Sequence, residues 1–299
     1  MEKFNCVVIG AGAAGLNASL VLGRSHKKVL LFDNQQNRNR VTQESHGFLT
    51  RDGIAPASFK KLSLEDVLKY PTVQYEEQTV TCITRQDDDT FKVETTESTF
   101  LAETILIATG VQEEFPAITN IYSYYGKSLF SCPFCDGYEN SHQPLVFIVE
   151  DEAHALMKGK LIQNWTNNLL IATNGHEFSK EALNTLTAYG IEISMEPIKQ
   201  LIGEDGQLQA IQFLSGQQIE RAGGFVDTKF IRKNDFAEQL KCEMNELGEI
   251  VADESGRTSQ KGVYVAGETA KIEPSSLIMA AAEGYKAAIA IVLDQTNNR

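Results

Sequence analysis

The first 33 residues contain a glycine-rich turn that follows a predicted strand and begins a predicted helix. An apolar run, residues 4–9, precedes the motif Gly10-x-Gly12-x-x-Gly15, and a helix rich in small residues continues to about residue 24. Gly10 permits a tight turn, Gly12 lets a pyrophosphate approach the backbone, and Gly15 allows close packing of helix on strand. The helix N-terminus offers N–H groups to phosphates. This pattern predicts a dinucleotide site in a Rossmann-like fold.

The second strand of this unit, residues 29–32, ends in Asp33. An acidic side chain at that position is placed to bind a ribose hydroxyl. Two later segments favour FAD over a nicotinamide dinucleotide. They are Ala108-Thr109-Gly110, at the end of a buried strand, and the segment 264–268, which ends in Gly267-Glu268 before a long Ala-rich helix. FAD needs such a second contact region for its ribityl chain and ring.

A close cysteine pair, Cys132-Pro133-Phe134-Cys135, stands at a predicted loop-to-helix junction. A helix N-terminus lowers the pKa of a thiol, and the thiolate is the reactive form. One sulfur can then face a flavin while the other attacks a substrate disulfide. Asp136 is the candidate acid–base group for the departing thiol. Half of a zinc site is the alternative, but a closed site needs four ligands and the sequence has no second Cys-x-x-Cys.

The second half of the chain repeats the first strand–helix–strand skeleton at a spacing of 140 residues, without its phosphate chemistry. Gly10 corresponds to Glu150, Gly12 to Glu152, Gly15 to Ala155 and Asp33 to Thr173. A β-carbon at each glycine position blocks close approach, and the acidic run 150–152 repels a pyrophosphate or caps its own helix. The segment after the second strand, 174–178, has no arginine for a 2′-phosphate. We therefore expect a Rossmann-like shape without ordinary NADPH binding.

Composition limits the class of protein. The chain has 299 residues and a formal charge of −13, so it lacks the basic surface that nucleic-acid binding requires. No apolar run is long enough to span a membrane, and no signal-peptide pattern is present, so we expect a cytoplasmic protein. Residues 73–102 alternate in the manner of antiparallel strands, and helix and strand patterns alternate from residue 145 to about 230.

We expect an α/β fold with two Rossmann-like, three-layer domains, the second inserted into the first. The predicted boundaries give an FAD-binding domain from residues 1–114 and 243–299, and a Cys-x-x-Cys domain from residues 115–242. Cys6, Cys82 and Cys242 have no partner in the pattern and are interpreted as structural thiols.

The order of these motifs resembles that of the low-molecular-weight thioredoxin reductases, in the class II pyridine nucleotide-disulfide oxidoreductase superfamily, over essentially the full length. The stretches 38–40 and 46–49 are most similar to a branch with dithiol oxidases such as gliotoxin oxidase. The missing nucleotide motifs resemble those of ferredoxin-dependent flavin thioredoxin reductases. Glu268 stands where Asp is usual in the family, and Pro274-Ser275-Ser276 stands where an Arg-Gln pair is usual.

The resemblance implies a homodimer, with His46 near the flavin and the residues after Pro274 at its ring. It also implies that Cys132 attacks the substrate, Cys135 faces the flavin and Asp136 handles the proton. The residues expected to contact FAD are Gly10, Gly12, Ala13, Ala14, Gly15, Asp33, Asn34, Arg40, His46, Val80, Ala108, Thr109, Gly110, Gly267, Glu268, Ser275, Ser276 and Leu277.

The leading hypothesis is an FAD-dependent thiol–disulfide oxidoreductase that receives electrons from a protein such as ferredoxin or flavodoxin. Its substrate would be a thioredoxin-like protein or a small dithiol or disulfide. Several alternatives stay open: a dithiol oxidase that passes electrons to oxygen, a reductase that binds NADPH in a non-standard pose, and a second flavin in the second domain. A non-enzymatic redox sensor is a further alternative.

Overall fold

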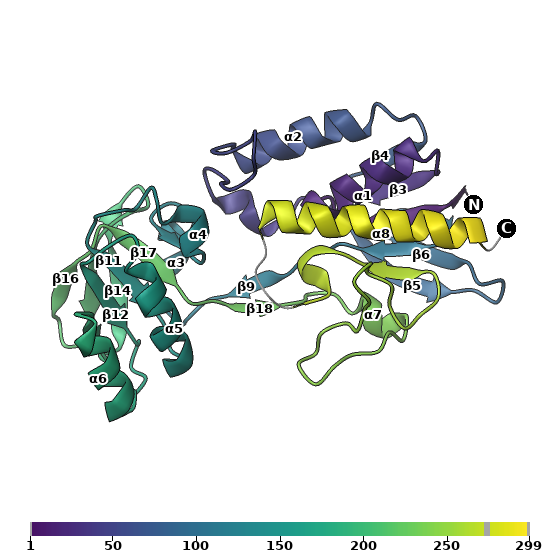
Figure 1. The fold of residues 1–299 in the computed structure, drawn as a ribbon. Helices are drawn as coiled ribbons and strands as arrows, with labels where there is room; N and C mark the ends of the chain where they lie inside the picture. The colour runs from purple at the N-terminus through teal and green to yellow at the C-terminus, as the bar shows by residue number, and fades with distance from the viewer. Residues whose placement is uncertain (1, 272–275, 298–299) are drawn as a thin grey trace. The chain divides into compact units, whose positions relative to one another are not determined.

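The computed structural model describes residues 2–271 and 276–297, and it divides the chain into two compact units (Figure 1). Unit 1 comprises Met1–Arg40, Gly47–Gln112 and Phe230–Arg299, and unit 2 comprises Val41–His46 and Glu113–Lys229. The chain therefore leaves unit 1, forms most of unit 2 and returns. In the described part of the chain, no helix is both long and apolar enough to cross a membrane.

Unit 1 is built on a parallel five-stranded sheet of order β19-β8-β2-β3-β4. These strands are β2 (Cys6–Ile9), β3 (Val29–Phe32), β4 (Val73–Glu76), β8 (Ile105–Ile107) and β19 (Val263–Val265). Side chains alternate between the two faces of a strand. Cys6 and Val8 accordingly belong to one core cluster, and Val7 and Ile9 belong to another.

Helices cover one face of this sheet and a second sheet covers the other, which makes three layers (Figure 1). The helices are α1 (Ala13–Arg24), α2 (Pro56–Val67) and α8 (Leu277–Asn297). The second sheet contains β1 (Lys3–Phe4), β7 (Thr99–Ala102), β6 (Phe91–Thr95) and β5 (Val80–Arg85), and it is joined in the core by α7 (Phe236–Gln239).

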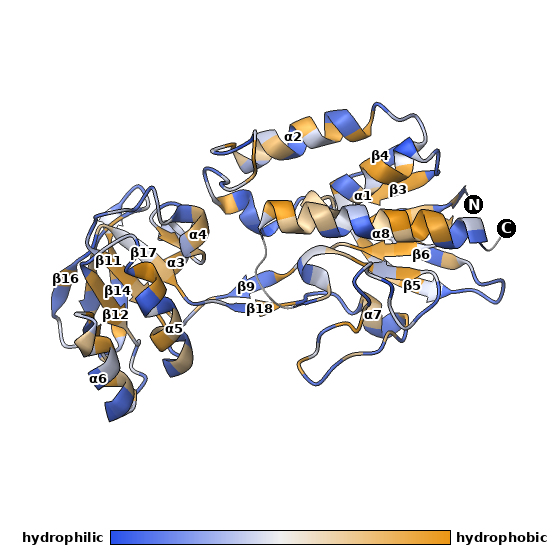
Figure 2. Cartoon of the chain, viewed as in Figure 1, coloured by the Kyte–Doolittle hydropathy of each residue, from blue (hydrophilic) through white to orange (hydrophobic). Residues whose placement is uncertain are grey.

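Unit 2 repeats this plan with a parallel sheet of order β10-β17-β11-β12-β13. The strands are β10 (Leu129–Phe130), β11 (Leu145–Ile148), β12 (Leu169–Ala172), β13 (Glu192–Ser194) and β17 (Gly223–Val226). One face carries α5 (Glu152–Ile162) and α6 (Lys180–Ala188), and the other carries α3 (Ile121–Tyr124) with β14 (Ile198–Glu204), β15 (Gln207–Phe213) and β16 (Gln218–Glu220). In both units the parallel strands are among the most hydrophobic segments (Figure 2).

The α/β class with two Rossmann-like halves is confirmed, but three details differ from the sequence expectation. Val73 pairs with Val29 in a parallel ladder, because β4 is the edge strand of the main sheet and a half-exposed edge alternates like an antiparallel strand. Strands β14–β16 form an antiparallel meander where helix–strand alternation was expected. The return to unit 1 falls at Phe230 instead of residue 243, because Phe236 of α7 packs into the unit 1 core.

Two short strands lie where the chain passes between the units. β9 (Gln112–Glu114) and β18 (Lys229–Ile231) form a two-stranded sheet. Two single turns of 3₁₀-helix, η1 (Arg38–Val41) and η2 (Gly267–Thr269), and one turn of α-helix, α4 (Pro133–Asp136), carry residues that the sequence singled out.

Candidate functional site

The glycine motif of unit 1 forms a turn in which each glycine meets a different constraint. Gly10 has φ +108°, and a β-carbon there would lie 2.3 Å from the carbonyl oxygen of Ala108. A β-carbon on Gly15 would lie 1.8 Å from the carbonyl oxygen of Gly10. A β-carbon on Gly12 would meet nothing within 4 Å. The first two glycines are therefore required by packing, whereas Gly12 borders open space.

The N-terminus of α1 is uncapped by any side chain. Gly12 is its N-cap residue, no side chain accepts a hydrogen bond there, and the first turn has no acidic residue. Helix N-termini leave several N–H groups without helical partners and carry a partial positive charge. This open, electropositive turn fits the pyrophosphate of a dinucleotide such as FAD.

Helix α8 packs closely against the start of α1. A β-carbon on Gly284 would lie 2.0 Å from the carbonyl oxygen of Ala14, and Asn17 donates a hydrogen bond to the carbonyl of Ala281 at 2.6 Å. Ala13 and Ala14 are buried in α1. The small residues of both helices thus bring the glycine turn and the last helix together.

Asp33 follows β3 and is only 4% exposed. It forms an ion pair with Lys60 of α2, and it accepts hydrogen bonds at 2.9 Å from the Tyr75 hydroxyl and from the Gln35 amide. Burial, together with the bond to Asp33, raises the pKa of the Tyr75 phenol. The sequence analysis missed both side-chain partners. Asn34, the next expected contact, is exposed.

The two later segments that pointed to FAD meet at one hydrogen bond. The Gly110 amide donates to the Thr269 hydroxyl at 2.8 Å, which ties the turn after β8 to η2. Thr109 accepts a hydrogen bond from Asn234 at 3.0 Å. Ala108 is buried at the end of this strand, and Gly267 has φ +69°. The structure therefore brings both segments together within unit 1.

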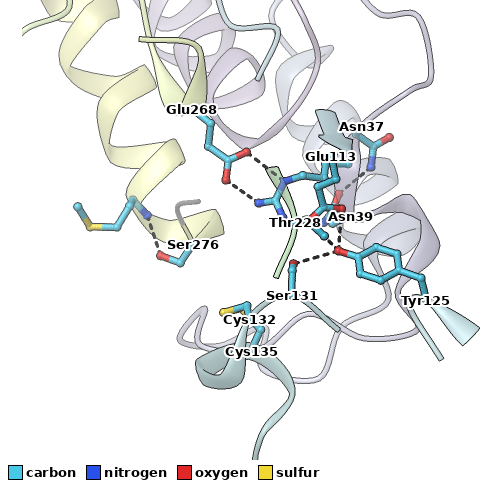
Figure 3. A network of polar contacts seen from close by, with 12 residues as sticks. Asn37, Asn39, Glu113, Tyr125, Ser131, Cys132, Cys135, Thr228, Glu268 and Ser276 are labelled. Atoms are coloured by element: carbon cyan, nitrogen blue, oxygen red, sulfur yellow. Dashed lines mark hydrogen bonds and ion pairs between the residues drawn. A yellow bond between two sulfur atoms is a disulfide. The ribbon is translucent and has the colours of Figure 1, made fainter. Parts of the chain in front are cut away.

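Glu268 forms a two-contact ion pair with Arg38 of η1. The Nη2–Oε1 distance is 2.5 Å and the Nε–Oε2 distance is 3.3 Å, with side chains 21% and 12% exposed (Figure 3). A bidentate arginine–carboxylate pair holds both groups in a fixed geometry. Arg38 belongs to the stretch that supported the resemblance, but its pairing with Glu268 was not anticipated.

The remaining expected flavin contacts are spread over unit 1. Arg40 is exposed and donates to the Asn37 carbonyl at 3.1 Å, whereas the Val80 side chain is 5% exposed and lies in the core. Ser276 accepts a hydrogen bond from the Met279 amide at 3.4 Å, and Leu277 begins α8. Ser275 lies outside the described residues.

Cys132 and Cys135 form a disulfide in unit 2, with their Cα atoms 5.3 Å apart (Figure 3). Cys132 is the N-cap of the four-residue helix α4, and its carbonyl accepts hydrogen bonds from the Cys135 and Asp136 amides at 3.1 and 3.2 Å. Gly137 lets this turn pack on Trp165, because a β-carbon there would lie 2.7 Å from the indole. Phe134, between the cysteines, is 74% exposed and contacts Trp165 edge-on.

Asp136 is the carboxylate beside this disulfide. Burial and, to a smaller extent, the nearby charge of Glu139 raise its pKa, His46 opposes them, and the net result is a pKa of about 7 in place of 3.8. The His46 Nε2 lies 3.5 Å from Glu44 and 3.6 Å from Glu139. The structure thus places His46 in the same unit as the disulfide. A carboxyl group with a pKa near 7 can both give and accept a proton at neutral pH.

A hydrogen-bond network holds the residue before Cys132. The Tyr125 hydroxyl lies 2.9 Å from the Ser131 hydroxyl and 2.6 and 2.7 Å from the two carboxylate oxygens of Glu113 (Figure 3). Thr228 also reaches Glu113, at 3.4 Å. Glu113 and Thr228 stand at the two ends of the main unit 2 segment. The sequence carried no signal for this network, because no motif links Glu113, Tyr125 and Ser131, and Thr228 is 115 residues from Glu113.

The N-terminus of α5, which corresponds to that of α1, is closed by its own carboxylates. Asp151 caps the helix by accepting from the His154 amide at 2.8 Å, and Glu152 accepts from the Ser179 hydroxyl at 3.0 Å. Glu150 accepts from the Asn174 amide group at 2.9 Å. All three carboxylates therefore accept hydrogen bonds from neighbouring groups of the protein, at the place where a pyrophosphate would bind.

Among residues 2–271 and 276–297, no group of three or more His, Cys, Asp or Glu side chains is arranged to hold a metal ion. The free cysteines Cys6 and Cys242 are buried, and burial raises the pKa of both thiols. Cys82 is half-buried.

Comparison with known proteins gives consistent matches. The sequence profile described as pyridine nucleotide-disulphide oxidoreductase matches residues 4–284. A protein named probable thioredoxin reductase, from Arthroderma benhamiae, is 25% identical over 331 aligned residues, covering 100% of this chain and 82% of that one. Thioredoxin reductase sirT of Leptosphaeria maculans is 26% identical, covering 89% of this chain and 87% of that one.

Solved structures agree with these sequence matches. The crystal structure of a protein assigned as thioredoxin reductase TrxB, from Bacillus anthracis, matches with a TM-score of 0.97 at 55% identity, covering 99% of each chain. The crystal structure of HlmI matches with a TM-score of 0.93 at 29% identity, covering 99% of this chain and 93% of that one.

Proposed function

Because the chain belongs to the pyridine nucleotide-disulphide oxidoreductase family, we propose that it exchanges electrons between FAD and the Cys132–Cys135 disulfide without drawing them directly from NADPH. The chain is a thioredoxin-reductase-like disulfide oxidoreductase, an FAD-binding enzyme. The finer proposal concerns its electron donor, its substrate and the residues that act.

The closed N-terminus of α5 is the observation that carries the proposal. A pyrophosphate would have to displace the Asp151 cap and lie among Glu150, Asp151 and Glu152. Like charges at such short range disfavour binding, and the N–H group of His154, which could compensate, is already engaged by Asp151. We therefore propose a protein donor of the ferredoxin or flavodoxin type.

The flavin contacts are proposed for unit 1. The turn at Gly12 and the N-terminus of α1 would hold the pyrophosphate, and Asp33 would bind the adenosine ribose. The turns at Gly110 and Glu268, tied together by the Gly110–Thr269 hydrogen bond, would border the ribityl chain. When bound, FAD supplies two-electron redox chemistry at the disulfide.

The chain's own residues would complete the exchange with substrate. In the dithiol form, the Cys132 thiolate attacks a substrate disulfide, so that a Cys132–substrate bond forms and the substrate S–S bond breaks. Asp136 protonates the departing thiolate. The Cys135 thiolate then attacks Cys132, which re-forms the Cys132–Cys135 disulfide and releases the second substrate thiolate. We propose a thioredoxin-like protein or a small disulfide as substrate.

The test is anaerobic reduction of the purified flavoprotein. We expect excess NADPH or NADH to leave the oxidised-flavin absorbance band unchanged, whereas dithionite or reduced ferredoxin bleaches it. Bleaching by NADPH at a catalytic rate would overturn the proposal for the donor. Oxygen consumption driven by small dithiols would identify the oxidase direction instead.

A matched variant tests the disulfide separately. Cys132→Ser/Cys135→Ser should retain flavin, but its reductive titration with dithionite should consume two electrons fewer per chain, because the disulfide is a two-electron couple. If the variant and the parent protein consume the same amount, the disulfide does not exchange electrons with the flavin.

A further inference from the structure

His46 of unit 2 lies among carboxylates beside the disulfide. Its Nε2 atom is 3.5 Å from Glu44 and 3.6 Å from Glu139. Glu139 follows Asp136 by three residues in the turn that continues α4, and residues at this spacing in a helical turn lie on one face. The charges of both His46 and Glu139 act on the Asp136 carboxyl. The four groups therefore form one cluster, of which the proposed function uses only Asp136.

The segment that carries His46 is held on unit 2, although the chain on both sides of it belongs to unit 1. At the first residue of the segment, the Val41 carbonyl oxygen packs so closely on Gly126 that a β-carbon on Gly126 would lie 2.4 Å from it. At the last residue, His46 pairs with Glu139. Contacts with unit 2 at both ends of the segment therefore fix the position of His46 beside the cysteine turn.

The proposed reaction consumes protons. Reduction of a substrate disulfide takes up two electrons and two protons and gives two thiols. A ferredoxin-type donor delivers electrons alone, so both protons come from water. Asp136 gives a proton to the departing substrate thiolate, and it must regain one before the next turnover. A route for protons from water to Asp136 is therefore part of the chemistry that the proposed function requires.

Exposure to water rises in steps along the cluster. Asp136 is half-buried, and its raised pKa reports a poorly hydrated carboxyl that a docked substrate would cover further. The His46 side chain is 18% exposed, whereas the side chains of Glu139 and Glu44 are 41% and 57% exposed. An imidazole both takes up and releases a proton near neutral pH, and a proton can pass between two such groups through one water molecule. These properties fit a path from water, through His46, to Asp136.

We propose that His46 returns a proton from water to Asp136 in each turnover, with Glu139 holding its imidazole ring in place. The step moves one proton: protonated His46 gives it to the Asp136 carboxylate, and the neutral imidazole regains one from water. His46 acts through Asp136 and does not touch the substrate. This role rests on the proton transfer by Asp136 in the proposed function, and it does not depend on which electron donor is used.

The first experiment compares two disulfides that differ in their need for a proton. The flavoprotein is reduced with dithionite, freed of excess reductant and mixed anaerobically at pH 8 with hydroxyethyl disulfide or with the aromatic disulfide dithiobis(nitrobenzoate), while flavin reoxidation is followed. Asp136 is mostly ionised at this pH, so the alkyl thiolate needs a proton that is delivered during the reaction. An aromatic thiolate is a weak base and leaves without one. His46→Ala should slow reoxidation by the alkyl disulfide at least about tenfold and leave the rate with the aromatic disulfide unchanged.

The sign of the change separates a proton relay from a simple charge effect. If His46 acted only through its charge, its loss would raise the pKa of Asp136, more of the carboxyl would be protonated at pH 8, and the alkyl disulfide would react faster. A relay predicts a slower reaction, and free imidazole should then restore the rate of His46→Ala in proportion to its concentration. His46→Gln, which fills the space of the ring, should be slow without being rescued. In an Asp136→Asn background, His46→Ala should have no further effect.

His154→Ala is the matched control, because its imidazole also pairs with a carboxylate of unit 2, that of Asp227 at 2.8 Å. This variant should react with both disulfides at the rates of the parent protein. A parent protein that neither disulfide reoxidises would contradict the proposed function itself. If both disulfides reoxidise the parent, and His46→Ala matches it on the alkyl disulfide or does not respond to imidazole, the role of His46 is wrong while the proposed function stands.

Discussion

The helices α1 and α5 begin at equivalent places in two similar units, yet their N-termini are opposite in character. Gly12 leaves the start of α1 without a side-chain cap and bordering open space. Asp151 caps α5, and Glu152 follows in its first turn. The same backbone plan thus gives an open helix N-terminus in unit 1 and a helix N-terminus closed by its own side chain in unit 2.

Under the proposed function, this difference is how unit 2 would exclude a nucleotide without a loss of helix stability. A carboxylate at a helix N-terminus replaces the phosphate that would otherwise satisfy the N–H groups. Acidic substitutions at such a position therefore stabilise the helix while they exclude an anionic cofactor. In this chain α1 has the uncapped N-terminus and α5 has the capped one. Substitutions that give each helix the N-terminus of the other test the comparison.

The largest effect is expected from Gly12→Asp, which gives α1 the cap of α5. The new carboxylate should weaken FAD binding at least about 100-fold by repelling the pyrophosphate. The cap should raise the stability of the flavin-free protein by only about 0.3 kcal/mol, because glycine is itself a tolerated N-cap residue. The flavin-to-protein absorbance ratio and urea unfolding of the flavin-free protein measure the two effects. Gly12→Asn is the control, because it adds a capping side chain of the same size without the charge, so it should weaken FAD binding less than Gly12→Asp does. Full flavin occupancy in Gly12→Asp would show that α1 does not hold the pyrophosphate.

The next largest effect is expected from Asp136→Asn in unit 2, with Glu139→Gln as its comparison. Asp136 has a pKa raised to about 7, so the folded state binds its proton more tightly than the unfolded chain does. Ionisation of Asp136 in the folded protein therefore lowers the free energy of unfolding. This loss grows as the pH rises from about 4 to 7 and stays constant at higher pH. Asp136→Asn should remove a cost on the order of 2–4 kcal/mol at pH 8 and almost none at pH 4.

Urea unfolding at both pH values measures this change, and the steady-state rate of disulfide reduction should fall in the same variant because its proton carrier is lost. If Asp136→Asn raised the free energy of unfolding equally at both pH values, the pKa of Asp136 would not be raised in the folded protein. Glu139→Gln provides the comparison, because loss of its charge should lower the pKa of Asp136 without removing the carboxyl group.

Local patterns predicted the parts of the fold that depend on local constraints. The glycine turn, the strand and helix that flank it and their repeat in unit 2 follow from glycine spacing and apolar periodicity, and β12 falls exactly 140 residues after β3. The parallel pairing of β4 was missed because an edge strand alternates regardless of the direction of its neighbour. The assignment of Val41–His46 to unit 2 depends on contacts distant in sequence, which periodicity does not encode.

The candidate site shows the same limit. Turn geometry requires glycine at two of the positions that the motifs named, Gly10 and Gly110, which have positive φ. The side-chain partners of Asp33 and Glu268 were not predictable, because Lys60 and Arg38 come from other elements, and Arg38 is 230 residues from Glu268. Long, flexible side chains can pair with many acids, so only the folded structure selects one.

A smaller effect is expected from exchanging the residues at the third position of the glycine motif, which is Gly15 in unit 1 and Ala155 in unit 2. Gly15→Ala in unit 1 places a β-carbon 1.8 Å from the Gly10 carbonyl oxygen, so the helix must shift at a cost of about 1–3 kcal/mol, with partial loss of flavin. The equivalent change in unit 2, Ala155→Gly, should cost about 1 kcal/mol through helix propensity and leave the flavin bound. Thermal unfolding with flavin absorbance measures both. Equal flavin loss in the two variants would mean that the effect is global.

The smallest effect is expected from Asp151→Ala, which removes the α5 cap without building a phosphate site. The loss of the hydrogen bond from the His154 amide should cost about 1 kcal/mol in urea unfolding. Flavin content and the lack of response to NADPH should not change, because Glu150 and Glu152 still occupy the site. Glu181→Ala, in the first turn of α6 where Ser179 is the cap, is the matched control and should cost less. If Asp151→Ala alone makes the flavin reducible by NADPH, the Asp151 cap is the barrier to the nucleotide. Unit 2 would then bind the nucleotide despite Glu150 and Glu152.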